Sequence, residues 1–254
     1  MIVNLHTHTT RCHHAEGTDE EYVLAAIDRG FKTLGFSDHT PHRYPDGFVS
    51  RVRMTPVQLP EYADSIRALK EKYADQITIH LGVEAEYFPE LFSDTLALLR
   101  ENGVEYMLLG QHFLVPGEAY NCASPTEDES LLESYCNLVI QAMETGLFTY
   151  VAHPDFVNFV GERNIYERHM RRLCRTAKGC DIPLEINKLG LLVERHYPSN
   201  RFFSIVAEEG CKVVIGSDAH KPELVLHEKN EARAMEIVDR FGLELITEPE
   251  IRKI

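Results

Sequence analysis

Residues 4–17 of the chain read NLHTHTTRCHHAEG, with four histidines directly behind a short apolar run. His6 and His8 are two residues apart, so on a β-strand both imidazoles project from the same face. Two imidazoles on one face can bind one divalent ion. This stretch therefore predicts a strand that ends in metal ligands, and it raises the question of whether other strands end in the same way.

Apolar runs of strand length alternate with helix-like segments along the whole chain. The apolar runs are residues 2–5, 33–36, 77–83, 106–110, 148–152, 183–186 and 212–216. The helix-like segments behind them are residues 18–30, 59–74, 90–102, 128–146, 165–179, 202–210 and 227–242. Thr18 and Glu21 have the spacing of a capping box at the start of the first helix. Because no internal repeat or Pro/Gly/Ser-rich linker divides these units, we predict one domain over residues 1–254.

Every apolar run is followed by at least one polar side chain that could serve as a ligand. These side chains are His6, His8, Asp38, His39, Glu84, Glu86, His112, His153, Asp155, Glu185, Asn187, Asp218 and His220. In an open sheet, only the strands beside a switch point can share a ligand. In a closed barrel, the carboxyl ends of all strands converge on one face. We therefore predict an α/β fold, a (β/α)7 TIM-like barrel with the site at the carboxyl ends of its strands.

Composition excludes several classes of function. A formal net charge of −14 disfavours non-specific binding to nucleic acid or to an anionic membrane. The six cysteines lack CxxC spacing, which argues against a zinc knuckle and, in a chain of this length, against a disulfide framework. No signal peptide and no apolar stretch of about 18 residues is present, so we expect a cytoplasmic protein. An anionic substrate then needs a locally positive site, which bound metal ions can supply.

The candidate ligands outnumber what a single ion needs. The set that suffices for two or three ions is His6, His8, His14, His39, His112, His153 and His220 with Glu84 and Asp218. Mixed imidazole and carboxylate ligands suit Zn, Mn or Fe, and clustered ions are typical of displacement at phosphorus or hydrolysis at carbon. We assign structural roles to His13, His80, His169 and His227, which lie inside a strand, on helix-like segments or beside a better candidate.

The order of these motifs resembles a known family. The motifs are HTH (6–8), HHAEG (13–17), SDH (37–39), GVEAEY (82–87), GQHF (110–113), AHPD (152–155) and GSDAH (216–220). Together they resemble the polymerase and histidinol phosphatase (PHP) family, and longer phrases such as RMTPVQLPEY (53–62) are similar to its histidinol-phosphatase branch. The resemblance implies a distorted barrel of seven βα units, in agreement with the seven units above.

The resemblance also implies how the ligands are shared among three ions. One ion would be held by His6, His8, Glu84 and Asp218. Glu84 would bridge to a second ion held with His112 and His153. A third ion would be held by His14, His39 and His220, with Glu16 as a further oxygen donor. Because His13 and His14 are adjacent, the register favours His14 without excluding His13.

The implied reaction is hydrolysis of a phosphate monoester, with the ions activating water and absorbing charge on the phosphoryl oxygens. Glu84 and Asp218 would belong to the catalytic set through the ions that they hold. Guanidinium groups suit phosphate oxygens, and the candidates are Arg163 and Arg195, then Arg51 and Arg53, with Asn187 as a further substrate contact. His42 and His196 are candidate acids for the leaving alkoxide by residue type and loop position. Glu86, Tyr87 and Tyr120 are candidate contacts for an imidazole and an amine.

The resemblance to the histidinol-phosphatase branch implies L-histidinol phosphate as the substrate, which would place the protein in histidine biosynthesis. A second hypothesis keeps the metal site and changes the substrate to a nucleotide, another small phosphomonoester or a phosphodiester end. A third reading is a non-catalytic metal-binding module. A fourth is a metal-dependent amidohydrolase, although no lysine occupies a motif position at a strand end.

Overall fold

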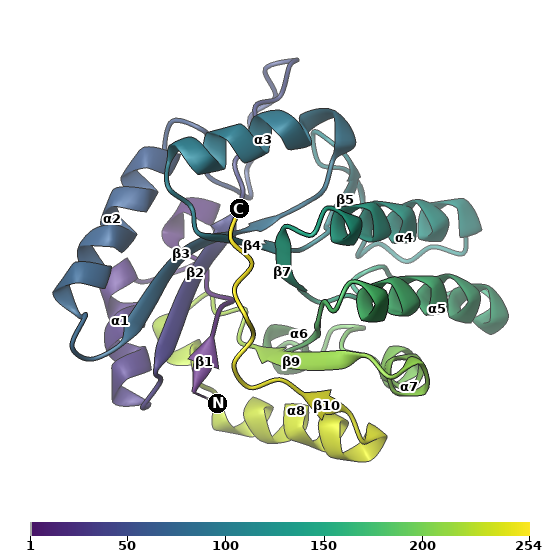
Figure 1. The fold of residues 1–254 in the computed structure, drawn as a ribbon. Helices are drawn as coiled ribbons and strands as arrows, with labels where there is room; N and C mark the ends of the chain where they lie inside the picture. The colour runs from purple at the N-terminus through teal and green to yellow at the C-terminus, as the bar shows by residue number, and fades with distance from the viewer. Residues whose placement is uncertain (1) are drawn as a thin grey trace.

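One curled sheet of eight parallel strands forms the centre of the molecule in a computed structural model that describes residues 2–254 (Figure 1). In spatial order the strands are β1 (Val3–Asn4), β2 (Thr33–His39), β3 (Thr78–Ala85), β4 (Tyr106–Leu109), β7 (Phe148–Val151), β8 (Leu184–Asn187), β9 (Lys212–Gly216) and β10 (Glu244–Leu245). The first seven are the strands expected from the apolar runs. The α/β, TIM-like fold predicted from the sequence is therefore confirmed.

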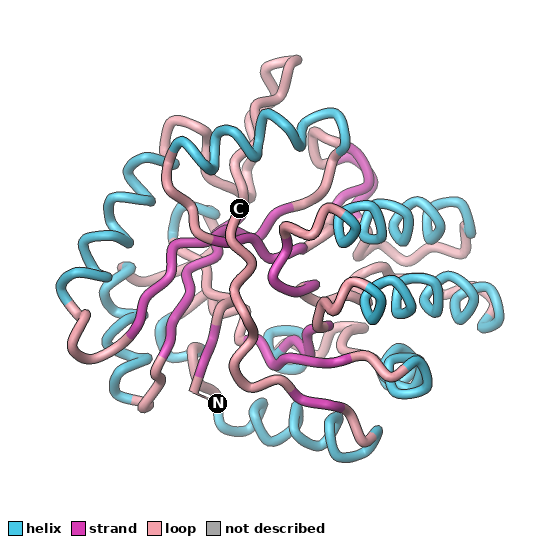
Figure 2. Tube along the Cα trace, viewed as in Figure 1, coloured by secondary structure: helices cyan, strands magenta, loops and turns pink. Residues whose placement is uncertain are grey.

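The helices lie around the outside of this sheet (Figure 2). Those expected from the sequence are α1 (Asp19–Asp28), α2 (Leu59–Lys72), α3 (Pro89–Glu101), α4 (Glu129–Glu144), α5 (Arg163–Gly179), α7 (Asn200–Glu209) and α8 (Glu228–Phe241). Thr18 and Glu21 form the predicted capping box at the start of α1. No helix among residues 2–254 has the length and apolar character needed to cross a bilayer, and all six cysteines are free.

The two edges of the sheet meet at the end where the candidate ligands lie. Thr7, beyond β1, forms a parallel bridge with Ala219, beyond β9, and the backbone N–H of His8 donates to the carbonyl of Ala219 at 2.9 Å. At the opposite end β10 pairs with β9 instead, and Lys253 near the C-terminus bridges to Tyr106 of β4. The N-terminal ligands are thereby brought beside those that follow β9.

A small apolar cluster lies inside the curled sheet. Its buried members are Leu5, Tyr106, Leu108, Tyr150 and Val214, while the larger core lies between the sheet and the helices. A Cβ at Gly35 or Gly82 would collide with the Tyr106 side chain, so both positions need glycine. The Tyr106 hydroxyl lies 2.7 Å from the carbonyl of Leu5, to which it donates. The Tyr106 side chain thus joins β4 to Leu5 and to the glycines of β2 and β3 inside the curled sheet.

Several short elements were not expected from the sequence. They are the hairpin of β5 (Phe113–Val115) and β6 (Ala119–Asn121), the strand β10, the short helix α6 (Lys188–Leu192), and the 3₁₀ turns η1 (Thr10–Cys12) and η2 (Pro222–Leu224). They follow strand ends or the last helix and carry too few residues for a periodic pattern. His13 ends η1 with a φ of 69°, a left-handed conformation that reverses the chain before His14.

Candidate metal centre

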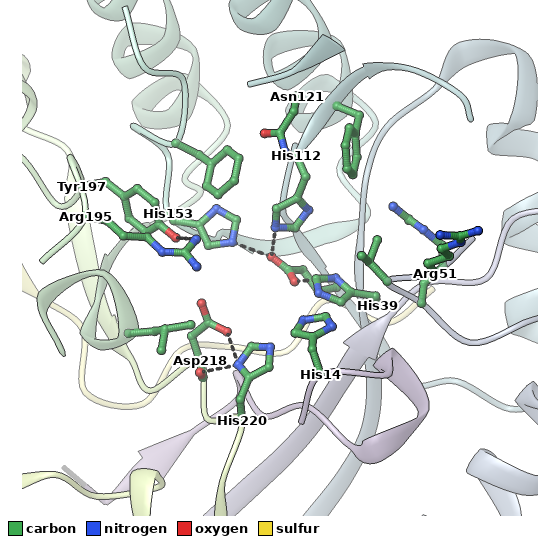
Figure 3. A pocket seen from close by; sticks show the side chains of 16 residues that line it. His14, His39, Arg51, His112, Asn121, His153, Arg195, Tyr197, Asp218 and His220 are labelled. Carbon is green, nitrogen blue, oxygen red and sulfur yellow. Dashed lines mark hydrogen bonds and ion pairs between the residues drawn. The ribbon is translucent and has the colours of Figure 1, made fainter. Parts of the chain in front are cut away.

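The predicted ligands converge at the carboxyl ends of six strands and the loops behind them. His6, His8 and His14 follow β1, His39 ends β2, Glu84 lies in β3, His112 follows β4, His153 follows β7, and Asp218 and His220 follow β9. Figure 3 shows His14, His39, His112, His153, Asp218 and His220 directed into one cavity. Residues more than 200 positions apart in the chain thus share one site.

Four ligand atoms enclose a space of the size that one ion requires. His6 Nε2 and His8 Nε2 are 3.2 Å apart, and each lies 3.5–3.6 Å from Glu84 Oε2. Asp218 Oδ1 lies 3.5 Å from His6 Nε2 and 3.1 Å from His8 Nε2. A tetrahedral ion with bonds of about 2.0–2.1 Å has ligand-to-ligand distances of about 3.3–3.4 Å. The five measured distances match this cage.

The other oxygen of Glu84 faces a second pair of imidazoles. Oε1 lies 2.7 Å from His153 Nε2 and 3.5 Å from His112 Nε2. Glu84 is 1% exposed, yet neither of its carboxylate oxygens makes a hydrogen bond with acceptable geometry. A buried carboxylate without hydrogen bonds is costly unless a cation balances it. The surroundings of Glu84 therefore fit a carboxylate that binds ions through both oxygens.

A third group of imidazoles lies beside the first. The His14 ring centroid is 4.8 Å from that of His220 and 5.4 Å from that of His39. Both His13 and His14 are exposed, but of the two only His14 is among the residues that line the cavity. The structure thus brings His14 to the site in preference to His13. The sulfur of buried Cys12 also lies within 4.8 Å of the ligand nitrogens of His14 and His220.

The histidines of the site fall into two kinds by the direction of their pKa shifts. Burial, with His8 as the next cause, lowers the pKa of His39 to about 4 and that of His220 to about 3. Burial would also lower the pKa of His8, but the carboxylates of Asp218 and Asp38 raise it to about 9. Burial would raise the pKa of Glu84, but the imidazoles around it, His112 first, hold it well below its usual value. The site therefore places ionised carboxylates beside both neutral and protonated imidazoles, and an ion that binds His8 must displace its proton.

Buried hydrogen bonds from β8 orient two of these ligands. His6 Nδ1 donates to Glu185 Oε1 at 2.7 Å, which directs Nε2 toward the centre. Asn187 Nδ2 donates to Glu185 Oε2 at 2.9 Å and to Asp218 Oδ2 at 3.1 Å, while its oxygen accepts from the Gly190 N–H at the start of α6. Such bonds fix the orientation of metal ligands. Asn187, predicted to touch substrate, instead lies buried behind the ligands with its amide fully used.

The cavity in front of these ligands has a volume of about 390 Å³. Besides the ligands, its walls contain Arg51, Val52, Arg53, Phe113, Asn121, Phe156, Leu189, Arg195 and Tyr197. Arg195 and Arg51 lie on opposite sides of the imidazole cluster (Figure 3). Arg195 Nη1 donates to the Tyr197 hydroxyl at 3.0 Å. Phe156 and Tyr197 could not be recognised from the sequence, because a lone aromatic residue in a loop carries no periodic signal.

Three predicted residues are not placed for the roles expected of them. Arg163 begins α5, is 81% exposed in its side chain, pairs with Glu167 and does not line the cavity. Glu16 is exposed, pairs with Lys221 at 2.9 Å and does not line the cavity. Arg53 does line the cavity, but its guanidinium is paired with buried Glu86. Each of these three side chains is paired with a residue of opposite charge, and a sequence pattern does not reveal such pairs.

Neither candidate general acid reaches the cavity. His42 is 4% exposed, shares a hydrogen bond between Nδ1 and the Thr95 hydroxyl at 3.0 Å, and lies behind Glu86. His196 Nε2 donates to the Phe156 carbonyl at 2.8 Å. Neither residue is among those that line the cavity. The predicted role in protonating the leaving group is not supported for either histidine, and both have structural contacts.

The side chains expected to select an imidazole and an amine are also directed elsewhere. Glu86 is 2% exposed and ion-paired with Arg53. Tyr87 packs against the main core, and Tyr120, on β6, is 66% exposed. None of the three lines the cavity. Among the residues that do, Glu84 and Asp218 are the carboxylates, and both face the imidazoles.

Comparison with known proteins agrees with the arrangement of the ligands. The family model described as "PHP domain" matches residues 4–189, which include most of the strands that carry the ligands. The chain belongs to the PHP family. The Asp218 and His220 motif lies beyond the matched residues, yet the bridge between Thr7 and Ala219 brings it to the same centre. This PHP-family chain therefore has the donor set of a site for divalent metal ions.

Relatives named as phosphatases cover most of this PHP-family chain. It is 31% identical over 228 residues to a "Probable histidinol-phosphatase" of Deinococcus radiodurans, with 87% of each chain covered. It is 25% identical to a "Histidinol-phosphatase" of Bacillus subtilis, with 85% of this chain and 92% of the relative covered. A "Probable phosphatase" of Shewanella loihica is 24% identical, over 87% and 78% of the two chains. The similarity is thus to phosphatases that differ in named specificity.

A solved structure shares the fold. The histidinol phosphate phosphatase of Lactococcus lactis, complexed with Zn, L-histidinol and phosphate, superposes with a TM-score of 0.74. The alignment covers 99% of this chain and 98% of that one at 16% sequence identity. At this identity the likeness shows a shared fold.

Proposed function

We propose that this protein is a metal-dependent phosphomonoesterase that hydrolyses L-histidinol phosphate to L-histidinol and phosphate, as a step of histidine biosynthesis. The observation that carries the proposal is Glu84, a buried carboxylate whose two oxygens face two separate sets of imidazoles. The relatives named as histidinol-phosphatases, at 25–31% identity over most of the chain, support this substrate.

Two or three divalent ions of Zn, Mn or Fe fit the donor groups. His6, His8, Glu84 and Asp218 would hold the first ion, and Glu84, His112 and His153 the second. His14, His39 and His220 would hold a third. When bound, such ions stabilise negative charge on phosphoryl oxygens and lower the pKa of water. His39 and His220, whose pKa values lie at about 4 and 3, are already deprotonated at neutral pH.

Arg195 is the residue of this chain best placed to bind the phosphate. It lines the cavity on the side of His153, and its bond to the Tyr197 hydroxyl uses one guanidinium nitrogen. A guanidinium can donate two parallel hydrogen bonds to a phosphate, so the remaining N–H groups suit non-bridging oxygens. Tyr197 would hold this guanidinium in place, and Phe156 and Leu189 would exclude water from the rest of the ester.

A second candidate function is hydrolysis of another small phosphate ester. The composition of the cavity wall favours it. The wall contains Arg51, Arg53 and Arg195, and its only carboxylates are those of the candidate metal centre, Glu84 and Asp218. An amine-bearing substrate would therefore have no further carboxylate in the wall to bind. The relative from Shewanella loihica is named only as a probable phosphatase. This candidate keeps the metal centre and changes only the group esterified to phosphate.

Phosphate release from three substrates separates the two functions. L-Histidinol phosphate, a nucleoside monophosphate and an aryl phosphate are compared at equal loading with Mn²⁺ or Zn²⁺. We expect kcat/KM for L-histidinol phosphate to exceed the others by at least about 100-fold, equivalent to about 2.7 kcal/mol in transition-state binding. Equal or higher activity on another phosphate would favour the second function. No activity in the fully loaded protein would contradict both.

A further inference from the structure

Glu86 lies directly behind one of the candidate metal ligands. It follows β3, two residues beyond Glu84, and is 2% exposed. Its Oε1 lies 3.3 Å from His112 Nδ1, the ring nitrogen opposite the one that faces Glu84. His112 Nδ1–H can therefore donate to Glu86 while Nε2 is directed to the centre. This arrangement resembles the bond between Glu185 and His6 on the other side of the site.

Arg53 holds Glu86 in this position. Its two terminal nitrogens donate to the two Glu86 oxygens, at 2.9 Å for Nη2 and in a shorter contact for Nη1. Both side chains are almost fully buried, at 2% and 1% exposure. A bidentate pair of this kind fixes the plane of the carboxylate. The Oε1 atom that faces His112 is thereby held in one place.

The same guanidinium connects the ligand to the rim of the cavity. Arg53 Nη1 also lies 3.4 Å from the Thr40 carbonyl, and its Nε lies 3.7 Å from Glu118 in the β5–β6 hairpin. Glu118 accepts a short hydrogen bond from the Ser50 hydroxyl. The loop that contains Ser50 and Arg53 is thus attached both to the hairpin and to the carboxylate behind His112.

We propose that Glu86 is a positioning residue, locked by Arg53, that orients His112 for the ion shared with Glu84 and His153. This deepens the proposed function and rests on its metal centre. It also gives Arg53 a role other than the phosphate contact expected from the sequence. Bonds from outside the ligand shell fix the tautomer and ring orientation of a ligating histidine, and their loss typically lowers metal affinity by about 10–100-fold.

The chain contains a matched control in a second glutamate–histidine pair. Glu105 Oε2 lies 2.7 Å from His80 Nδ1, and its other oxygen accepts from Lys70 at 2.6 Å. This pair has the same chemistry, a carboxylate between an imidazole and a basic side chain, but none of its three members lines the cavity. Glu105→Gln therefore removes an equivalent carboxylate without touching the centre.

The test measures ions bound per chain and their affinity, with no substrate present. Glu86→Gln keeps the shape of the side chain and removes its charge. The double variant Glu86→Leu/Arg53→Met removes both buried charges together, because a lone buried charge would threaten the fold. In chelator competition with Zn²⁺, we expect both variants to bind one ion about 10–100-fold more weakly and to keep the affinity of the others. Glu105→Gln should bind every ion as the wild type does.

The possible outcomes separate this proposal from the function on which it rests. Unchanged affinity for every ion in both Glu86 variants would overturn the positioning role, even if the wild type hydrolyses L-histidinol phosphate. An equal weakening of all ions, or the same loss in Glu105→Gln, would show a general effect on folding and would also overturn it. A wild type that binds ions but releases no phosphate would contradict the proposed function alone. A wild type that binds no ion would contradict both.

Discussion

Glu84→Gln tests the centre most directly, because this one side chain contacts two sets of ligands. Three imidazole nitrogens lie 3.1–3.6 Å from Oε2, and two lie 2.7–3.5 Å from Oε1. Glutamine has nearly the same shape but offers one oxygen and no charge. Its NH₂ group would face a position where the wild type has a metal-binding oxygen. Both proposed ions therefore lose charge, and one of them loses a ligand.

The magnitude follows from these two losses. Removing even an indirect partner of a metal ligand costs about 10–100-fold in affinity or activity. A directly bound carboxylate shared by two ions should cost at least that for each, which gives a loss of kcat/KM of about 10³-fold, or about 4 kcal/mol. We expect Glu84→Gln to bind at least one ion fewer per chain at equal free metal.

The assay is phosphate release from L-histidinol phosphate at saturating Mn²⁺ or Zn²⁺, with metal content measured on the same samples. Glu105→Gln is the control, because it removes a carboxylate that pairs with a histidine outside the site. It should keep kcat/KM within about twofold. If Glu84→Gln keeps its full metal content and loses less than tenfold in kcat/KM, the bridging role of this carboxylate is refuted.

Three further predictions concern binding, packing and pH. Arg195→Ala should lower kcat/KM by about 10–150-fold through loss of a charged hydrogen bond of about 1.5–3 kcal/mol. Arg163→Ala, outside the cavity, should change kcat/KM less than twofold. Equal effects of the two substitutions in steady-state kinetics would contradict the proposed phosphate contact of Arg195. In urea unfolding, Gly82→Ala should lower the free energy of unfolding by about 1–3 kcal/mol, because its Cβ meets a buried tyrosine ring. Gly179→Ala lies in a helix with open space around it and should raise the free energy of unfolding by about 0.5–1 kcal/mol. The opposite order of the two variants would be incompatible with the packing. Burial would raise the pKa of Glu105, but its histidine and lysine partners lower it to about 2. Glu105→Gln therefore removes a stabilisation of at most about 1 kcal/mol for this partly exposed group. This stabilisation should be complete above pH of about 4.5 and should disappear as the pH falls toward 2. A difference between the two proteins that grows toward low pH would have the wrong sign.

The sequence predicted which side chains come together, because their positions follow from chain geometry alone. Parallel strands of a barrel all end on one face, so any polar residue at a strand end is brought to the same place. His6 and His8 needed only the two-residue period of a strand to share a face. The structure agrees for these residues and brings Glu84, His153 and Asp218 to them, although they come from three other strand ends.

The same logic failed where the partner of a side chain decides its role. Arg53 lies in a loop and Arg163 begins α5, yet the first pairs with a buried carboxylate and the second with a residue one helical turn away. His42 follows the second strand as a loop residue should, but its ring is buried against Thr95. Such contacts depend on side-chain direction and on long-range packing, and no spacing along the chain encodes them.

The charge of the protein is reconciled with an anionic substrate by the same buried contacts. The chain carries a formal charge of −14, but near the cavity the carboxylate of Glu86 is matched by Arg53. Glu84 and Asp218 remain beside imidazoles, where two or three divalent ions would add about +4 to +6. The wall then presents Arg195 and Arg51 without a competing free carboxylate among its lining residues. We therefore expect the affinity for phosphate to depend on ion loading, because the net charge of the chain is negative.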